Sequence, residues 1–466
     1  MSEQLTLHHF SFAELHLDGP APARDLFARL QAQPWAMLLE SASAQHPDSR
    51  FDIISADPVA TVVTEGATTR IEYPGTHRPA RVSTDDPLQL LQQTSSALLG
   101  APPYAGELPF IGGAIGLFGY DLGRRFERLP VLSQADITVP DMAQGIYDWA
   151  WILDKAHRQA TLLVQGDETA WQQRWLWWQQ QQTASLTPCR LTTQWQANMD
   201  EAGYRQRFAR IQAYLAAGDC YQINLTQRFC AGYQGSEWEA YCRLSSGNAA
   251  PFSAFLRLPH AAILSLSPER FLSLEGARVS TKPIKGTRPR HSEAAADAAA
   301  AEALRQADKD RAENLMIVDL LRNDIGRVCI PGTVRVPSLF AVESFPAVHH
   351  LVSTIEGELP STLTATDLLR ACFPGGSITG APKIRAMEII EELEPQRRNA
   401  YCGSIGYLSR HGRMDTSITI RTLIACQQTL YVWAGGGIVA DSRVEAEYQE
   451  TFDKLGRILP LLANNA

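Results

Sequence analysis

The sequence predicts an α+β fold, in which strands and helices mix without the regular alternation of a doubly wound sheet. Short apolar runs, separated by Pro, Gly and Asp turn signals, indicate strands in the first part of the chain. We expect them at Ala36–Leu39, Phe51–Ser55, Ala60–Thr64 and Thr69–Tyr73. Further along, a helix near Asp200–Ala217 precedes strand-like runs at Tyr221–Phe229, Pro251–Leu258 and Ala261–Leu266.

Two further segments have helical patterns. Trp171, Trp175 and Trp178 recur at helical spacing, which indicates a helix that packs on the core. The stretch Ser292–Asn323 is rich in alanine at first and amphipathic later, so it predicts one long helix or two close ones.

The length of the chain, 466 residues, is typical of two or three domain-sized units. The stretch Gln182–Thr193 has the composition of a linker. We therefore place a boundary near residue 195, between an N-terminal region 1–195 and a second region 196–466.

Charge and composition argue against several classes of protein. The net charge is −8 and no Lys/Arg-rich run occurs, which argues against a nucleic-acid partner. No apolar run approaches the roughly 18 residues that span a bilayer, and the start of the chain has no signal-peptide pattern. The eight cysteines include no C-x-x-C pair, as expected of reduced thiols. We therefore expect a cytoplasmic protein that uses neither nucleic acid nor a membrane.

Lysine is rare in this chain. Only six of the 42 Lys and Arg residues are lysines, and five of the six lie after residue 280. Lysine can act chemically as a neutral amine, which arginine cannot. Drift toward arginine codons explains the bias but not the position of the lysines.

Lys285 lies in a Pro-Ile-Lys-Gly-Thr sequence, a tight strand end where Gly286 would let a ligand approach the backbone. Glu269 lies 16 residues upstream, directly after an apolar strand, where its carboxyl group would be partly buried. Burial raises the pKa of a carboxyl group and lowers that of a lysine, so the two could supply a general acid and a neutral amine nucleophile. The alternative is an ordinary lysine in an exposed turn.

Glutamates at two places could hold a metal ion. Glu313 is flanked by apolar residues on an expected helix, and Glu447 and Glu450 share one face of another. Carboxylates from two helices, without a Cys or His cluster nearby, suit Mg²⁺, which prefers a few oxygen ligands together with water and substrate. The alternative for Glu313 is an ion pair with Lys309 on a solvated face.

Two glycine-rich stretches have different expected uses. Gly435, Gly436 and Gly437 follow an expected strand and could wrap backbone donors around a carboxylate, to which Arg421 would add a bidentate charge. The alternative is a simple turn. The stretch Gly112–Gly119 does not match a dinucleotide-binding motif, and we expect it to allow close packing of backbones.

In order and spacing, these motifs resemble the chorismate-utilising enzymes, a family that includes anthranilate synthase component I, aminodeoxychorismate synthase component I, and the isochorismate and salicylate synthases. The resemblance implies two interleaved lobes with large antiparallel sheets and outer helices. It also implies that Glu313 and Glu450 hold Mg²⁺, with Glu447 close by. The residues that it places around the substrate are Gly286, Thr287, His350, Tyr401, Arg421, Gly435, Gly436 and Gly437.

The residue at position 285 distinguishes members of this family. Anthranilate synthases carry alanine in the motif, whereas aminodeoxychorismate synthases carry lysine, as here. Isochorismate-type enzymes activate water with a lysine on an earlier strand, where this chain has Gln222. The resemblance therefore implies that Lys285 attacks chorismate, that Glu269 protonates the leaving hydroxyl, and that ammonia completes 4-amino-4-deoxychorismate. The alternatives are an anthranilate synthase and an inactive tryptophan-binding scaffold.

The resemblance also implies a partner and a second ligand. The chain shows no convincing glutaminase nucleophile, so ammonia would come from a separate glutamine amidotransferase subunit. Region 1–195 would be the N-terminal lobe with a tryptophan pocket, and region 196–466 the chorismate-binding catalytic region. The residues that fall where the tryptophan pocket would lie are Ser41, Asp48, Ser49, Arg50, Phe51, Pro251, Phe252 and Ser253.

Overall fold

The short apolar runs of the N-terminal half form strands at nearly the predicted bounds. The computed structural model describes residues 4–41, 49–101, 104–344 and 348–463. Within them, the first predicted strands are β2 (Met37–Glu40), β3 (Phe51–Ser55), β4 (Ala60–Glu65) and β5 (Thr68–Glu72). Gly66, with φ of +54°, makes the tight turn between β4 and β5.

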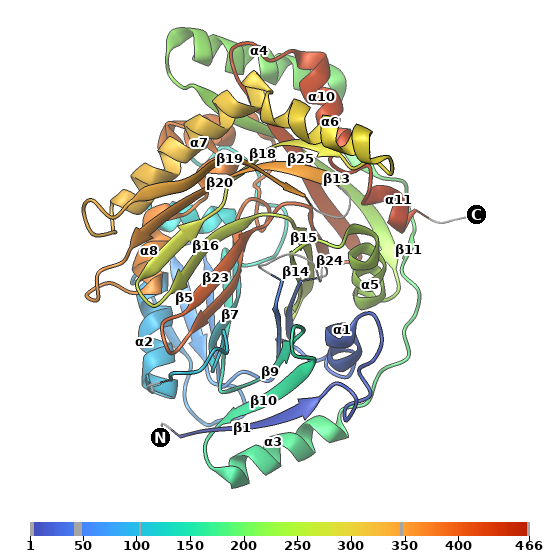
Figure 1. Cartoon of the computed structure of the whole chain (residues 1–466), viewed down its shortest axis with the longest axis vertical. Coiled ribbons are helices and arrows are strands. Elements are labelled where there is room, and N and C mark those ends of the chain that lie inside the picture. The colour runs from blue at the N-terminus through green and yellow to red at the C-terminus, as the bar shows by residue number, and fades with distance from the viewer. Residues whose placement is uncertain (1–3, 42–48, 102–103, 345–347, 464–466) are drawn as a thin grey trace.

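The strands of the described residues form two large sheets in which neighbouring strands run antiparallel, and helices lie on the outside (Figure 1). The 13-stranded sheet consists, in spatial order, of β1 (Leu5–Ser11), β10 (Gln159–Gln165), β9 (Trp149–Asp154), β3, β2, β14 (Phe252–Arg257), β15 (Ala261–Ser267), β24 (Thr422–Cys426), β25 (Thr429–Ile438), β13 (Gln222–Gln234) and β11 (Arg190–Leu191), with β12 (Gln196–Ala197) and β21 (Gly380–Ala381) also paired to β13. The 12-stranded sheet consists of β18 (Ile284–Pro289), β20 (Val348–Glu358), β17 (Arg278–Thr281), β16 (Arg270–Glu275), β23 (Met414–Ile418), β22 (Ser404–Ser409), β7 (Gly113–Phe118), β8 (Met142–Tyr147), β4, β5 and β6 (Arg81–Ser83), with β19 (Arg335–Ser344) paired to β20.

Each sheet combines strands from distant parts of the chain. In the 13-stranded sheet, Leu39 of β2 lies opposite Ala254 of β14. In the 12-stranded sheet, β7 likewise pairs with a strand from a distant part of the chain, β22. Segments on both sides of residue 195 thus share both sheets, as the interleaving of two lobes requires. A Cβ on Gly116 of β7 would lie 2.0 Å from the carbonyl oxygen of Ala143, so the predicted close backbone packing is confirmed.

The stretch from 292 to 323 forms two helices rather than one, because Gln306 and Ala307 leave the helical path between them. The helices of the described residues are α1 (Pro22–Phe27), α2 (Pro87–Leu99), α3 (Glu168–Gln180), α4 (Glu201–Ala217), α5 (Glu237–Asn248), α6 (Ala294–Arg305), α7 (Asp308–Gly326), α8 (Ala365–Cys372), α9 (Lys383–Leu393), α10 (Val444–Asp453) and α11 (Leu459–Leu462), with short 3₁₀ helices η1 (Tyr120–Arg125) and η2 (Gly376–Ile378). Figure 1 shows α4, α6, α7 and α10 gathered at one end of the molecule, over β18 and β25.

Apolar side chains fill the space between the two sheets and the space under the outer helices. The predicted tryptophan-faced helix is α3, in which the rings of Trp171 and Trp175 stack at 5.7 Å between centroids. Trp178 packs on Trp151 of β9 at 5.3 Å, which fixes α3 to the sheet. All eight cysteines are free, as predicted. None of the described helices is long and apolar enough to cross a bilayer.

Candidate active site

Lys285 projects from β18 at an irregular point of the sheet. Lys285 lies opposite Leu351 of β20, and the register shifts between Lys285 and Thr287. Gly286 stands between them with φ of +75°, and a Cβ there would lie 2.8 Å from the side-chain carbon Cγ of Asp310. The bulge therefore requires glycine next to Lys285, because any other residue would combine backbone strain with a clash.

Ser377 of η2 connects Lys285 to Glu269. The Lys285 ammonium donates to the main-chain oxygen of Ser377 at 3.4 Å. The side chain of Ser377 is hydrogen-bonded to the Glu269 carboxylate, which also accepts from the N–H of Ile284. Ser377 was not among the residues predicted for the site, and its place in a Gly/Ser/Thr-rich turn was the available signal.

Burial moves the pKa values of Glu269 and Lys285 toward each other. Glu269 follows β15 and is 5% exposed, and this burial raises its pKa although the charge of Lys285 opposes the shift. Burial lowers the pKa of Lys285, against the attraction of Glu313 and Glu269. Part of the Lys285 side chain contacts solvent, but protein atoms closely surround its ammonium. A neutral amine and a protonated carboxyl are therefore both easier to reach here than in water.

Three carboxylates from two helices converge beside β25. Glu313 lies on α7, and Glu447 and Glu450 lie on α10. A Cβ on Gly436 would lie 2.9 Å from Oε2 of Glu447 and 3.1 Å from Oε1 of Glu450, so glycine leaves room for both groups. Burial raises the pKa of Glu313 and of Glu447. Burial acts on Glu450 in the same direction, but the charge and hydrogen bond of Lys454, together with the charges of Lys285 and Lys309, outweigh it, and the pKa of Glu450 is lowered.

Two lysines lie against these carboxylates. The Lys309 nitrogen is 3.9 Å from Oε1 of Glu313 and 3.8 Å from Oε1 of Glu447. The Lys454 nitrogen is 2.8 Å from Oε1 of Glu450. The ion pair of Lys309 with Glu313, which the sequence offered as the alternative to a metal site, therefore exists. The Glu313 side chain is nevertheless only 18% exposed, and it lies close to Glu447.

The chemistry of this donor set fits a hard divalent cation. Carboxylate oxygens suit Mg²⁺, and Mg²⁺ commonly takes one or two carboxylates and completes its shell with water and substrate. In the described part of the chain, no group of three or more His, Cys, Asp or Glu side chains is arranged so that it could hold a metal ion by itself. Glu313 and Glu450, with Glu447 beside them, thus fit a cation that also needs other oxygen ligands.

The glycine run is part of a strand rather than a loop. Residues 435–437 lie within β25 and pair with residues 224–226 of β13. Pairing with β13 continues the strand through these glycines, so they do not form the simple turn that was the alternative, and their expected contact with a carboxylate stays a prediction. Their missing side chains create space: a Cβ on Gly437 would lie 2.1 Å from the amide nitrogen of the buried Gln222.

Arg421, directly before β24, adds a positive charge to this region, and His350, in β20, adds a neutral ring. Arg421 has φ of +52°, and within the described residues no hydrogen bond or ion pair engages its guanidinium, whose pKa burial lowers. Such a cation is suited to receive an anion, because a buried charge without a partner is costly. Burial and the nearby charge of Arg421 lower the pKa of His350 to about 4. The His350 Nδ1 atom lies 2.9 Å from the Thr287 hydroxyl.

Tyr401 packs in the interior. Its ring stacks on Trp433 at 5.8 Å between centroids and 7° between planes. The Arg398 guanidinium carbon lies 6.0 Å from the same ring. Among the described residues, no contact joins Tyr401 to Lys285 or to the glutamates, and its expected role at the substrate stays a prediction.

The residues of the expected tryptophan pocket lie mostly together between the two sheets. Ser41, Phe51, Pro251, Phe252 and Ser253 line one cavity of about 80 Å³. This volume is well below the roughly 300 Å³ at which small-molecule pockets typically begin. Ser49 is buried nearby in sequence, Arg50 lines an adjoining cavity, and Asp48 lies outside the described residues.

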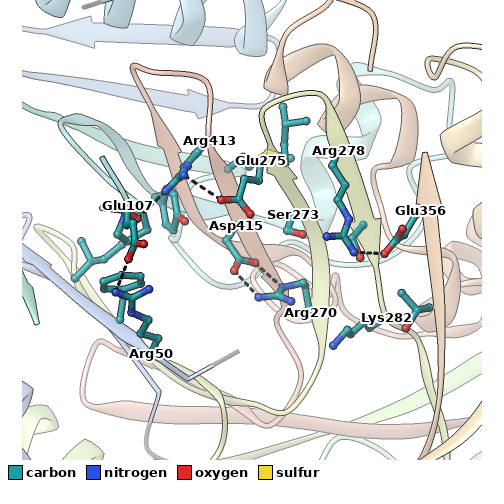
Figure 2. Close-up of a pocket in the computed structure, with 18 residues that line it drawn as sticks. Arg50, Glu107, Arg270, Ser273, Glu275, Arg278, Lys282, Glu356, Arg413 and Asp415 are labelled. Atoms are coloured by element: carbon teal, nitrogen blue, oxygen red, sulfur yellow. Dashed lines mark hydrogen bonds and ion pairs between the residues drawn. The ribbon is translucent and has the colours of Figure 1, made fainter. Parts of the chain in front are cut away.

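The adjoining cavity, of about 570 Å³, is lined mainly by charged residues of the 12-stranded sheet and of nearby loops, together with Phe51 and Ile53 of β3 (Figure 2). Figure 2 shows its ion pairs, in which Arg270 bonds Asp415 and Arg413 bonds Glu275. Along β20, Thr354 lines this cavity, whereas Leu351, opposite Lys285, is on the other face of the strand. None of the residues that line this cavity belongs to the candidate active site.

The comparison with protein families agrees with this geometry. The family model for chorismate binding enzymes matches residues 36–460. The chain belongs to this family of chorismate-binding enzymes. Among its relatives, aminodeoxychorismate synthase component 1 of Salmonella typhimurium is 59% identical over 96% of this chain and 97% of its own length. Aminodeoxychorismate synthase component 1 of Escherichia coli is 58% identical over 94% of this chain and 95% of its own length.

Solved structures of chorismate-binding enzymes share the fold. Anthranilate synthase component I of Streptococcus pneumoniae superimposes with a TM-score of 0.78 at 32% identity, covering 89% of this chain and 93% of that one. MenF, the menaquinone-specific isochorismate synthase of Escherichia coli, gives 0.73 at 18% identity, covering 98% and 95%. The predicted anthranilate-synthase-type fold is therefore confirmed.

Proposed function

We propose that this chorismate-binding enzyme converts chorismate and ammonia to 4-amino-4-deoxychorismate, a precursor of para-aminobenzoate and folate, with Lys285 as a covalent nucleophile. The observation that carries the proposal is the pairing of Lys285 with Glu269 through Ser377. Both pKa shifts favour the protonation states that the reaction needs. The named relatives at 58% and 59% identity support the same reaction.

The reaction proceeds in two displacements that return the enzyme to its starting form. The neutral Lys285 amine bonds to C2 of chorismate, the ring double bonds shift, and the C4–O bond breaks as Glu269 protonates the departing hydroxyl. Ammonia then bonds to C4, the double bonds shift back, and the bond from C2 to the protonated Lys285 nitrogen breaks, which releases the neutral amine. The new C4 ammonium returns a proton to the Glu269 carboxylate. The sum is loss of water and replacement of the C4 hydroxyl by an amino group.

Substrate binding requires compensation of two carboxylates. Glu313 and Glu450 would hold Mg²⁺, with Glu447 beside them, and the ion would neutralise the ring carboxylate when bound. The guanidinium of Arg421, which has no partner among the described residues, is suited to the second carboxylate. Gly286, Thr287 and the neutral imidazole of His350 would line the ring.

Ammonia would come from a separate glutamine amidotransferase subunit, which the name "component 1" of the relatives supports. The purified chain should then be active with ammonium salts alone and should use glutamine only after that subunit is added. Hydrolysis of glutamine by the purified chain alone would contradict this arrangement. Bound tryptophan would require the small cavity that Phe51 and Ser253 line to widen.

Product analysis tests the proposal. Purified protein, chorismate, Mg²⁺ and ammonium chloride should give 4-amino-4-deoxychorismate, identified by mass and chromatography. Fluorescent anthranilate as the main product would favour the activity named in the Streptococcus pneumoniae structure. No product with either nitrogen source would favour a tryptophan-binding scaffold.

A further inference from the structure

Lys309 lies in front of two of the three clustered carboxylates. It stands in the first turn of α7, and its nitrogen is 3.9 Å from Glu313 and 3.8 Å from Glu447, which belongs to α10. One ammonium therefore neutralises carboxylates of two different helices. Its side chain is 54% exposed, so it can turn into solvent without leaving a buried cavity.

Lys454 is held in a different way. Its nitrogen lies 2.8 Å from Glu450 and also donates to the main-chain oxygen of Gly435 at 2.6 Å. This second bond ties Lys454 to β25, whereas within the described residues Lys309 makes no hydrogen bond through its side chain and has only the two longer ion contacts. Lys309 is therefore the more easily displaced of the two cations.

We propose that Lys309 is a displaceable counter-cation: it neutralises Glu313 and Glu447 until a divalent ion binds Glu313 and Glu450 beside them, and it must then move away. This inference rests on the proposed function only for the magnesium site. An ion bound at about 2.1 Å from the Glu313 oxygen would lie within roughly 6 Å of the ammonium in its present position. Like charges at that separation repel, so ion binding and the present position of Lys309 compete.

Glu447 is prepared for the exchange. Its Oε1 atom also accepts from the Ser442 hydroxyl at 2.7 Å, so the carboxylate keeps its orientation when Lys309 leaves. The absence of a side chain on Gly436 leaves Oε2 of Glu447 and Oε1 of Glu450 facing the same space. Lys309 thus lowers the affinity for the ion but prevents repulsion among the glutamates before the ion arrives.

The test measures Mn²⁺ binding to the purified full chain without chorismate, by electron paramagnetic resonance of free Mn²⁺. Lys309→Met keeps the length of the side chain but removes its charge, and it should tighten Mn²⁺ binding by about threefold to tenfold. Lys309→Arg keeps the charge and should bind Mn²⁺ no more tightly than the wild type. The matched control is Arg311→Met, two residues along α7, whose charge faces Asp308 and the ring of Phe340.

A second readout is the melting temperature. Without added ion, Lys309→Met should melt below the wild type because the glutamates repel one another, and saturating Mn²⁺ should raise its melting temperature more than that of the wild type. Unchanged Mn²⁺ affinity in Lys309→Met, equal tightening in Arg311→Met, or no Mn²⁺ binding by any form would overturn the proposal. Product identity is measured separately, so failure here leaves the proposed reaction to its own test.

Discussion

The ammonium group of Lys285 donates a hydrogen bond to the main-chain oxygen of Ser377 at 3.4 Å. The side chain of the same serine is bonded to Glu269. One residue of η2 therefore positions both the expected nucleophile and the expected acid. This arrangement predicts different consequences for changes at the acid and at the serine.

Glu269→Gln should lower kcat at least about 100-fold, because a positioned general acid commonly contributes 10²- to 10⁴-fold and an amide cannot donate the proton. The KM for chorismate should change little, since the carboxylate-binding groups remain. Steady-state kinetics with saturating ammonium measure both constants. A kcat within about threefold of the wild type would remove Glu269 from the mechanism.

Ser377→Ala should shift the alkaline limb of the kcat profile to higher pH. The hydrogen bond from Ser377 lowers the pKa of Glu269, so its loss adds to the rise that burial already causes. Glu269 would then keep its proton to higher pH, where more of Lys285 is neutral. The check is kcat against pH for both proteins, and an unchanged or acid-shifted limb contradicts the assignment.

Glu313→Gln or Glu450→Gln should weaken the dependence on Mg²⁺ and the affinity for chorismate, because each removes an anionic oxygen ligand. Titration of activity with Mg²⁺ measures the first effect and substrate saturation the second. Glu445→Gln is the matched control on α10, since Glu445 is exposed and pairs with Arg205. Normal activity of the wild type in excess EDTA would rule out the metal site.

Arg421→Met should separate stability from binding. Removal of a partly buried guanidinium that has no described partner should raise the free energy of unfolding by about 1 kcal/mol. The same change should raise the KM for chorismate at least about tenfold, because a charge-assisted contact is lost. Denaturant unfolding and kinetics are the measurements, with exposed Arg322→Met as the control. Lower stability with unchanged KM would show a structural role instead.

Local patterns predicted much of the secondary structure. β3 begins and ends at the predicted residues, Phe51 and Ser55, because a short apolar run between turn signals leaves few alternatives. The pairing of β2 with β14 joins residues more than 200 positions apart, and no local pattern carries that information. The same long-range pairing places Gly435 to Gly437 in an extended strand, where their local sequence also allowed a turn.

The candidate site was partly predictable for a similar reason. Lys285 and Glu269 were found because their residue types are unusual beside Gly286 and after an apolar strand. Ser377 was missed because its contribution depends on where η2 lies against β18, and a serine in a glycine-rich turn has many ordinary uses. Position in the fold, rather than residue type, makes it part of the site.

Formation of a covalent intermediate on Lys285 is the central claim. Wild-type protein incubated with chorismate and Mg²⁺ without ammonia should gain the mass of chorismate less water, on the peptide that contains Lys285. Lys285→Ala should show no adduct but could keep some turnover with ammonia in the vacated space. Lys285→Arg should show neither, because a guanidinium stays protonated and cannot attack.

If Lys285 only donates a charge to the leaving hydroxyl, arginine should be the better replacement and no adduct should form. Intact-mass spectra of the wild type, Lys285→Ala and Lys285→Arg, taken at several times during incubation with chorismate and Mg²⁺, decide between these mechanisms. The covalent mechanism predicts a modified wild type and two unmodified variants. A wild type that stays unmodified at every time point would contradict it.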